Sequence, residues 1–135
     1  MIKMKLSLLE VFVIAVALGL VARIFVPGST QARTQRNVSE LMDCLAQMRA
    51  SIDLYRANHK GLLPQVDCFE NFEKAMTRCI GCHGPYMDKI PANPFNNLNT
   101  VRFDGKPAGA NLAGWRLDTK TGLLQADNDA AYEAL

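Results

Sequence analysis

Hydrophobic residues are distributed along the chain with three different patterns. Residues 6–22 are apolar apart from one serine and Glu10, and no helix-stopping residue occurs before Pro27. A helix over the whole stretch to that proline would be about 30 Å long, which is the thickness of the hydrocarbon core of a bilayer. The pattern therefore predicts an apolar N-terminal helix over residues 1–28 that anchors the chain in a membrane and is interrupted at Pro27.

The second pattern has the period of an amphipathic helix. From residue 29 the chain is polar on average, but apolar residues recur at steps of three and four, which predicts a helix over residues 29–60 with one buried face. The residues of this stripe are Val38, Leu41, Leu45, Met48, Ile52 and Tyr55. Gly61 follows as a helix-ending residue, and His59 and Lys60 lie at the negative end of the helix dipole.

The third pattern is that of loops and short strands. Residues 61–97 are rich in proline and turn residues, so we predict a loop with one short helical patch, "CFENFEKAMTR". Residues 98–127 contain three strand-like runs, and "DTKTG" between the last two predicts a hairpin turn with Gly122 at positive φ. Residues 29–135 should thus form one globular head, in which Tyr86 and Trp115 pack the sheet on the helix. The fold class is α+β, with a long N-terminal helix on a small antiparallel sheet.

Composition and charge exclude some functions and locate the head. The net charge is +2, which gives no indication of nucleic-acid binding. No Ser-His-Asp set, phosphate loop or paired carboxylates are recognisable, so we expect no enzymatic activity. Lys3 and Lys5 precede the apolar stretch, and such positive flanks stay in the cytoplasm. The interpretation is an inner-membrane anchor with the head outside the cytoplasm, where cysteines can be oxidised or modified.

Several sequence patterns resemble those of type IV pilins and type II secretion pseudopilins. They are "LSLLEVFVIAVALGLVARIFVP", "LYRANHKGLLP", "GPYMDKIPANPFN" and "GWRLDTKTGLLQADN", which together cover nearly the whole chain. The resemblance implies a pilin-like fold and a structural subunit that polymerises through its N-terminal helix. Its partners would be copies of itself or related pilin-like subunits, and the product a periplasmic or extracellular filament.

The resemblance also gives roles to four residues of the first stretch. Glu10, Gly19 and Pro27 match the glutamate, glycine and proline of the family helix, and Leu6 matches the first residue after processing. In the family, the glutamate pairs with the N-terminal amine of a neighbouring subunit. Lys5 stands where the family has glycine, so a lysine of the same or a neighbouring chain is an alternative cation.

Two interpretations of Glu10 remain open. A carboxylate inside a membrane is costly and usually functional, which favours a role in assembly. Glu10 could instead be solvated at the headgroup level of an ordinary anchor helix. In that case the chain would be a membrane-anchored domain that does not polymerise.

The run "CIGCH" matches the attachment sequence of c-type haem. The thiols of Cys79 and Cys82 would bond to the haem vinyl groups, and His83 would be an axial ligand of the haem iron. The predicted distal ligand is His59, with methionine as the alternative. The methionines considered are Met42, Met48, Met76 and Met87. With haem, the chain would be a pilin-like cytochrome that carries electrons along a filament.

The cysteines have two further interpretations. The chain has four, so they can form two disulfide bonds that join the loop to the helix. If Cys79 and Cys82 hold haem, Cys44 and Cys68 remain as a disulfide pair. Zinc is a third alternative, bound by Cys79, Cys82, His83 and one more cysteine.

Overall fold

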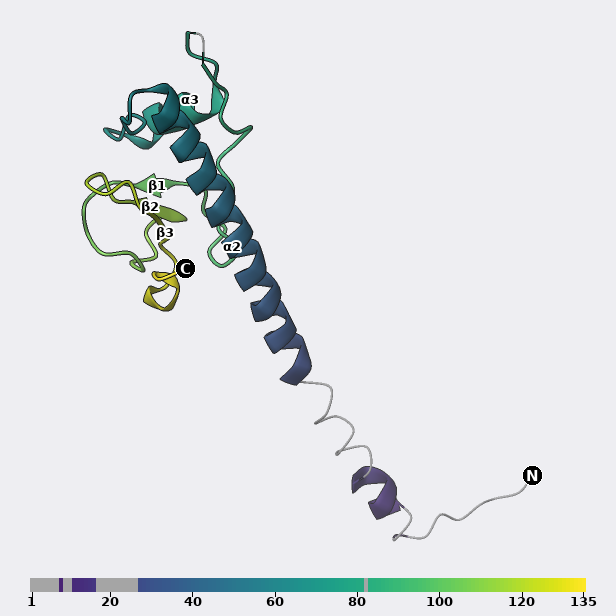
Figure 1. The fold of residues 1–135 in the computed structure, drawn as a ribbon. Helices are drawn as coiled ribbons and strands as arrows, with labels where there is room; N and C mark the ends of the chain where they lie inside the picture. The colour runs from purple at the N-terminus through teal and green to yellow at the C-terminus, as the bar shows by residue number, and fades with distance from the viewer. Residues whose placement is uncertain (1–7, 9–10, 17–26, 82) are drawn as a thin grey trace. The chain divides into compact units, whose positions relative to one another are not determined.

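The computed structural model describes residues 8, 11–16, 27–81 and 83–135, and the chain divides into two compact units, residues 1–36 and 37–135. The elements are α2 (Pro27–Asn58), α3 (Phe69–Thr77), β1 (Val101–Arg102), β2 (Trp115–Leu117), β3 (Leu124–Ala126) and the 3-10 helix η1 (Ala130–Tyr132) (Figure 1). A long helix with a small sheet confirms the predicted α+β class. The predicted short helix appears as α3, within the run that was expected to form it.

The structure contradicts the predicted membrane anchor. In the part of the chain that the structure describes, no helix is both long and apolar enough to cross a membrane. The longest helix there, α2, carries charged side chains such as Arg33, Arg36 and Glu40, which a bilayer core would exclude. The prediction of a transmembrane helix, and with it the inner-membrane location of the chain, is wrong on this finding.

The second unit is built on the predicted apolar stripe of α2. Leu41, Leu45, Met48 and Ile52 are almost fully buried, and Tyr55 is partly buried against the same core. The helix ends as its sequence predicts: the Gly61 N–H donates to the carbonyl of Arg56 at 2.7 Å, with Gly61 at a φ of +82°. This bond satisfies one of the carbonyls that a helix C-terminus leaves without a partner.

The sheet has three strands in the order β1-β2-β3, and it is mixed rather than antiparallel. β2 and β3 form the predicted hairpin, with Trp115 opposite Ala126 and Gly122 at a φ of +79°. β1, however, pairs parallel to β2, with Val101 opposite Trp115. The all-antiparallel prediction was wrong because residues 103–114 cross over before β2 begins, and about a dozen residues are enough for a parallel connection.

The two faces of the sheet differ in chemistry. Trp115, Leu117 and Leu124 belong to the core that contains the α2 stripe, and the Trp115 indole N–H donates to the carbonyl of Pro91 at 2.8 Å. On the alternate positions, Arg116 donates to the Gln125 side chain at 2.6 Å. Apolar residues therefore fix the sheet on α2, and polar residues that pair with one another occupy the other face.

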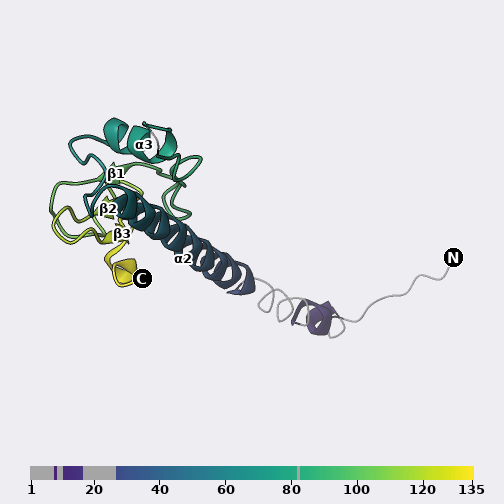
Figure 2. The ribbon, with the colours of Figure 1, turned by 45° about the horizontal axis from the view of Figure 1, so that its top comes forward.

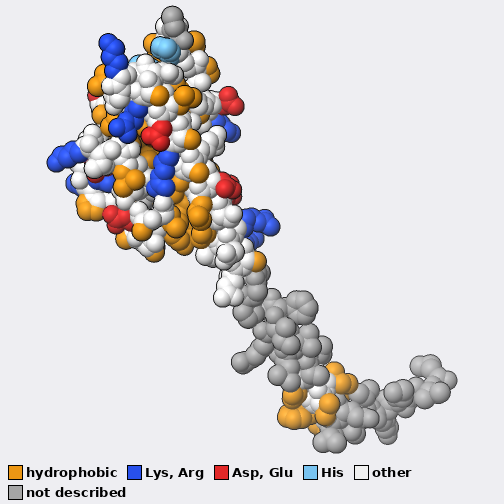
Figure 3. Space-filling view, viewed as in Figure 1, with side chains coloured by type: hydrophobic (Ala, Val, Ile, Leu, Met, Phe, Trp, Pro, Cys, Tyr) orange, Lys and Arg blue, Asp and Glu red, His pale blue; other side chains and the backbone are white. Residues whose placement is uncertain are grey.

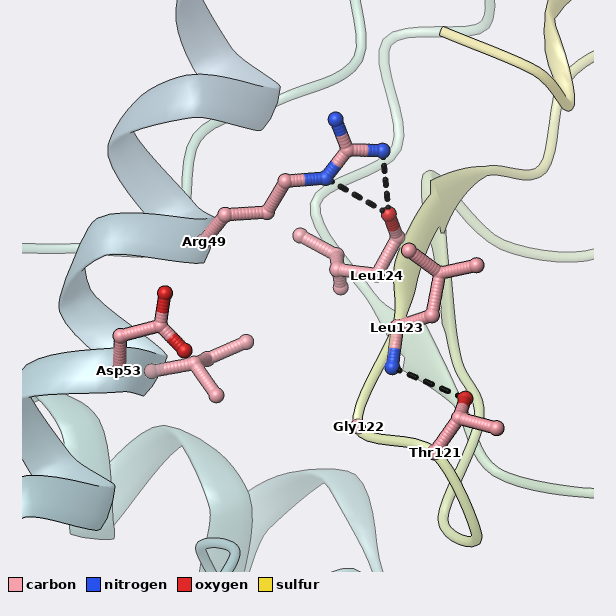
Figure 4. Close-up of a pocket in the computed structure, with 7 residues that line it drawn as sticks. Arg49, Asp53, Thr121, Gly122, Leu123 and Leu124 are labelled. Atoms are coloured by element: carbon pink, nitrogen blue, oxygen red, sulfur yellow. Dashed lines mark hydrogen bonds between the residues drawn. The ribbon is translucent and has the colours of Figure 1, made fainter.

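Arg49 joins α2 to the edge of the sheet. Its Nε and Nη2 atoms both donate to the carbonyl of Leu124, at 3.1 and 2.8 Å (Figure 4). A cleft of about 230 Å³ lies beside this contact, between α2 and the turn that contains Gly122. Because the guanidinium is already bound to the backbone of β3, we interpret this part of the cleft as structural.

The connection between β1 and β2 is organised by one buried carboxylate. The Asp127 side chain is fully buried and follows β3 directly. It accepts hydrogen bonds from the Arg102 guanidinium at both oxygens. It also accepts bonds of 3.1 to 3.3 Å from the N–H groups of Gly109, Ala110, Leu112 and Ala113. The crossover loop is therefore folded around a single charged group.

These contacts decide the ionisation of the buried pair. Burial alone would raise the pKa of the Asp127 carboxyl, but the hydrogen bonds from Arg102 and from the loop amides outweigh burial and hold this pKa below its ordinary value. The hydrogen bond to Asp127 raises the pKa of Arg102 in turn. Asp127 and Arg102 are therefore both charged in the folded protein.

The first prediction concerns the stability of this pair. Asp127→Asn should lower the free energy of unfolding by about 3–5 kcal/mol, because it breaks a buried ion pair and leaves the Arg102 guanidinium with only the exposed Asp104 as a counter-charge. Urea unfolding followed by circular dichroism measures the change. Asp88→Asn is the control, since Asp88 is exposed and should change stability by no more than about 0.5 kcal/mol. Equal losses in both variants would contradict the role of Asp127.

The second prediction concerns acid. Since the pKa of Asp127 is lower in the folded than in the unfolded chain, its ionised form stabilises the fold above the unfolded pKa of about 3.9. This stabilisation is lost as the pH falls through the folded pKa. Urea unfolding between pH 2 and 7 should show the wild type losing stability below about pH 4 more steeply than Asp127→Asn. Parallel pH profiles would count against this explanation.

Candidate functional site

Within the "CIGCH" run, Ile80 and His83 pair across a turn. The Ile80 N–H donates to the carbonyl of His83 at 3.0 Å, and the two residues form a β-bridge. Gly81 lies inside the turn at a φ of +69°, which glycine adopts without strain. Cys79 and His83 therefore lie on either side of the turn and both are exposed. Cys82 lies outside the described residues.

His59 is held at the C-terminal end of α2. Its ring stacks on that of Tyr55, with the ring centroids 3.9 Å apart and an interplanar angle of 7°. Its Nδ1 atom lies 2.9 Å from the carbonyl oxygen of Tyr55. Because a carbonyl can only accept, Nδ1 is assigned as the donor, which leaves Nε2 of the neutral imidazole as a free electron-pair donor.

The structure brings His59 and His83 together. Their ring centroids are 5.6 Å apart and their planes meet at 66°. The Tyr86 ring lies against both Tyr55 and His59, at 5.2 and 6.2 Å, in edge-to-face geometry. We call Tyr55, His59, His83 and Tyr86 the histidine–tyrosine cluster. Figure 3 shows histidine at the surface of this unit, next to hydrophobic side chains.

Backbone contacts position the cluster. The N–H groups of Tyr86 and Met87 both donate to the carbonyl of Met76 at the end of α3, at 2.9 and 3.1 Å. The Ser51 hydroxyl of α2 donates to the carbonyl of Tyr86 at 3.0 Å. Figures 1 and 2 both show α3 beside the C-terminal end of α2, where these contacts are made. The segment that follows the CIGCH turn is therefore fixed to two helices.

The chemistry available in the cluster is that of two imidazoles. The predicted proximal ligand His83 and the predicted distal ligand His59 are neighbours in the structure. Of the methionine alternatives, Met48, Met76 and Met87 are buried in the core, whereas Met42 is exposed on α2. No group of three or more His, Cys, Asp or Glu that could hold a metal ion occurs among the described residues. Any metal here would have to be bound by two histidines and by groups beyond these.

The three described cysteines are free thiols. Cys44 and Cys68 are partly buried and Cys79 is exposed. Cys44 packs against the core from α2, and Cys68 precedes α3. The Cys44–Cys68 disulfide, one of the pairings that the sequence allows, stays a prediction. Burial raises the pKa of the Cys44 thiol, and the nearby carboxylates of Glu40 and Asp43 raise it further. The Cys44 thiol is therefore poorly reactive.

The residues predicted to direct assembly are mostly not described. Leu6, Glu10 and Gly19 lie outside the described residues, and Pro27 is the first residue of α2. Proline is compatible with a first helical turn, because the N–H that it lacks would have no partner there. Within the first unit, residues 11–16 are helical and their large side chains are exposed. The exposed fractions are Val11 53%, Phe12 68%, Val13 60%, Ile14 49% and Val16 47%.

The sequence patterns identified the histidines of this cluster but not the tyrosines that pack against them. The CIGCH motif and His59 were both identified, but Tyr55 was assigned only to the buried stripe. The spacing of Tyr55 and His59, four residues apart on a helix, is the signal that could have predicted their stacking. Tyr86 gave no comparable signal, because its contact with the cluster depends on the fold of the loop.

The resemblance to pilins and pseudopilins rests on the sequence patterns alone. Comparisons of the chain with protein-family models, with curated proteins and with solved structures found no match. No relative therefore supports the assignment of this chain to a pilus or a secretion system.

Proposed function

We propose that the chain is a structural subunit that associates with copies of itself through its apolar N-terminal segment, as the pilins and pseudopilins that it resembles do. The observation that carries this proposal is the exposure of residues 11–16, which are consecutive apolar residues on a helix. Exposed apolar surface of this kind is typical of a site that binds another protein rather than of a surface that stays in contact with water.

Burying the side chains of this segment would contribute more free energy to association than a typical contact between exposed polar side chains. Burying one valine, isoleucine or phenylalanine side chain contributes about 1.5–3 kcal/mol. Consecutive residues of a helix point in all directions around its axis, so one flat partner could cover only some of them. Several copies of the same helix packed around one another would cover them all, which favours assembly over a single pairwise contact.

Glu10 gives the proposed assembly a means of fixing its register. A buried carboxylate needs a partner of opposite charge, because leaving it unpaired costs several kcal/mol. A cation from a neighbouring copy, either its N-terminal amine or a lysine such as Lys5, would supply that partner at one relative position only. Apolar packing would then provide the affinity and the charge pair would provide the alignment.

The third prediction tests the apolar segment. Phe12→Arg should weaken self-association about 10- to 100-fold, which corresponds to the burial energy of one aromatic side chain. Sedimentation velocity over a range of concentrations measures this change. Leu62→Arg is the matched control, since Phe12 and Leu62 are both 68% exposed but Leu62 lies in the second unit. The proposal would be refuted if Phe12→Arg associates as strongly as the wild type, or if both variants weaken association equally.

The fourth prediction tests the carboxylate. Glu10→Gln keeps the size of the side chain and removes its charge, so it should reduce the yield of ordered assemblies in negative-stain electron microscopy. Glu40→Gln, on the exposed side of α2, is the control and should assemble as the wild type does. If Glu10→Gln assembles normally, Glu10 does not set the register between subunits.

A further inference from the structure

We propose that His59 and His83 bind one transition-metal centre through their imidazole nitrogens. This inference goes beyond assembly, because it gives the second unit a ligand of its own. The two residues are the only histidines of the chain, and they come from a helix end and from a loop turn. The fold nevertheless places their rings 5.6 Å apart at the surface.

The ring separation suits a shared metal. A metal–nitrogen bond of about 2.0–2.1 Å places the centre of an imidazole about 3 Å from the ion, so two imidazoles at a tetrahedral angle have centroids about 5 Å apart. The observed 5.6 Å is close to this value. His83 is exposed, so turning its ring to direct a nitrogen at the ion disturbs little packing.

The surroundings of His59 are those of a metal ligand. Metal-binding histidines commonly donate their second ring N–H to a carbonyl or carboxylate, which fixes the tautomer and the ring orientation. The Nδ1 atom of His59 makes such a bond to the carbonyl of Tyr55, and stacking on the Tyr55 ring further restricts the imidazole. Nε2 is thereby left with its lone pair and in a fixed orientation.

Two neutral imidazoles select the class of metal. They suit zinc, copper, nickel and iron, whereas magnesium and calcium prefer oxygen ligands. The metal could come from two sources that share this chemistry. One is a hydrated divalent ion, whose remaining positions would hold water. The other is the iron of a haem attached at Cys79 and Cys82, for which His83 is the expected axial ligand.

The experiment uses the full chain as purified, and its visible spectrum decides the source. If a Soret band is present, His59→Gln should shift this band and the ligand-field bands, because the iron loses its sixth ligand. If no Soret band is present, the probe is Zn²⁺, titrated by calorimetry under reducing conditions. The wild type should then bind one Zn²⁺ per chain.

The variants separate metal binding from a merely structural role. His59→Gln and His83→Gln should each weaken Zn²⁺ binding at least ~10-fold, since even the loss of an outer-shell partner costs about 10–100-fold. The double variant should bind little more weakly than either single variant, because one remaining imidazole is a poor site. Lys89→Gln, an exposed change in the same loop, should bind as the wild type does. Circular dichroism without metal checks that each variant is folded.

Several results would overturn the proposal. In the absence of haem, these are no Zn²⁺ binding by the wild type, or binding that neither histidine variant weakens. Binding abolished by Cys79→Ser together with Cys82→Ser but unchanged by His59→Gln would assign the ion to the thiolates instead. In a haem-containing protein, a spectrum that His59→Gln leaves unchanged would exclude His59 from the metal centre.

Discussion

The second unit depends on placing one ionised carboxylate where water cannot reach it. Asp127 is fully buried, and it is stable there because Arg102 neutralises its charge and four amides of the crossover loop donate to its carboxylate oxygens. The same contacts fold the crossover that brings β2 alongside β1. Without them the N–H groups of this loop would need other partners, and the parallel pairing of Val101 with Trp115 would lose its support.

Local signals in the sequence were enough for much of this fold. The α2 stripe has the helical period, and Gly122 follows a run that favours a hairpin, so both were predicted from neighbouring residues alone. The parallel strand β1 could not be predicted in this way, because its direction depends on where the crossover is fixed. That position is set by Asp127, an aspartate that in the sequence looks like any other turn residue. Pairings that depend on one distant polar group leave no periodic pattern.

The candidate site shows the same division. The CIGCH motif and the helix-ending position of His59 are local features, and they were identified from the sequence. Their proximity depends on the contacts of Ser51 and Met76 with the segment around Tyr86, which join residues far apart in the chain. The apolar segment gave the opposite result. Its composition predicted a membrane span, but no helix in the described ranges is long and apolar enough to form one.

The end of α2 connects the core with the histidine–tyrosine cluster. A helix C-terminus leaves its last carbonyls without partners, and here the carbonyl of Tyr55 is taken by the imidazole of His59. The hydrogen bond that satisfies this helix carbonyl is therefore also the bond that fixes the orientation of the His59 ring and its Nε2 atom. The cluster belongs to residues 37–135, whereas the exposed apolar residues 11–16 belong to the other unit. The proposed assembly and the proposed metal binding thus rest on separate residues, so a variant that abolishes one should leave the other measurable.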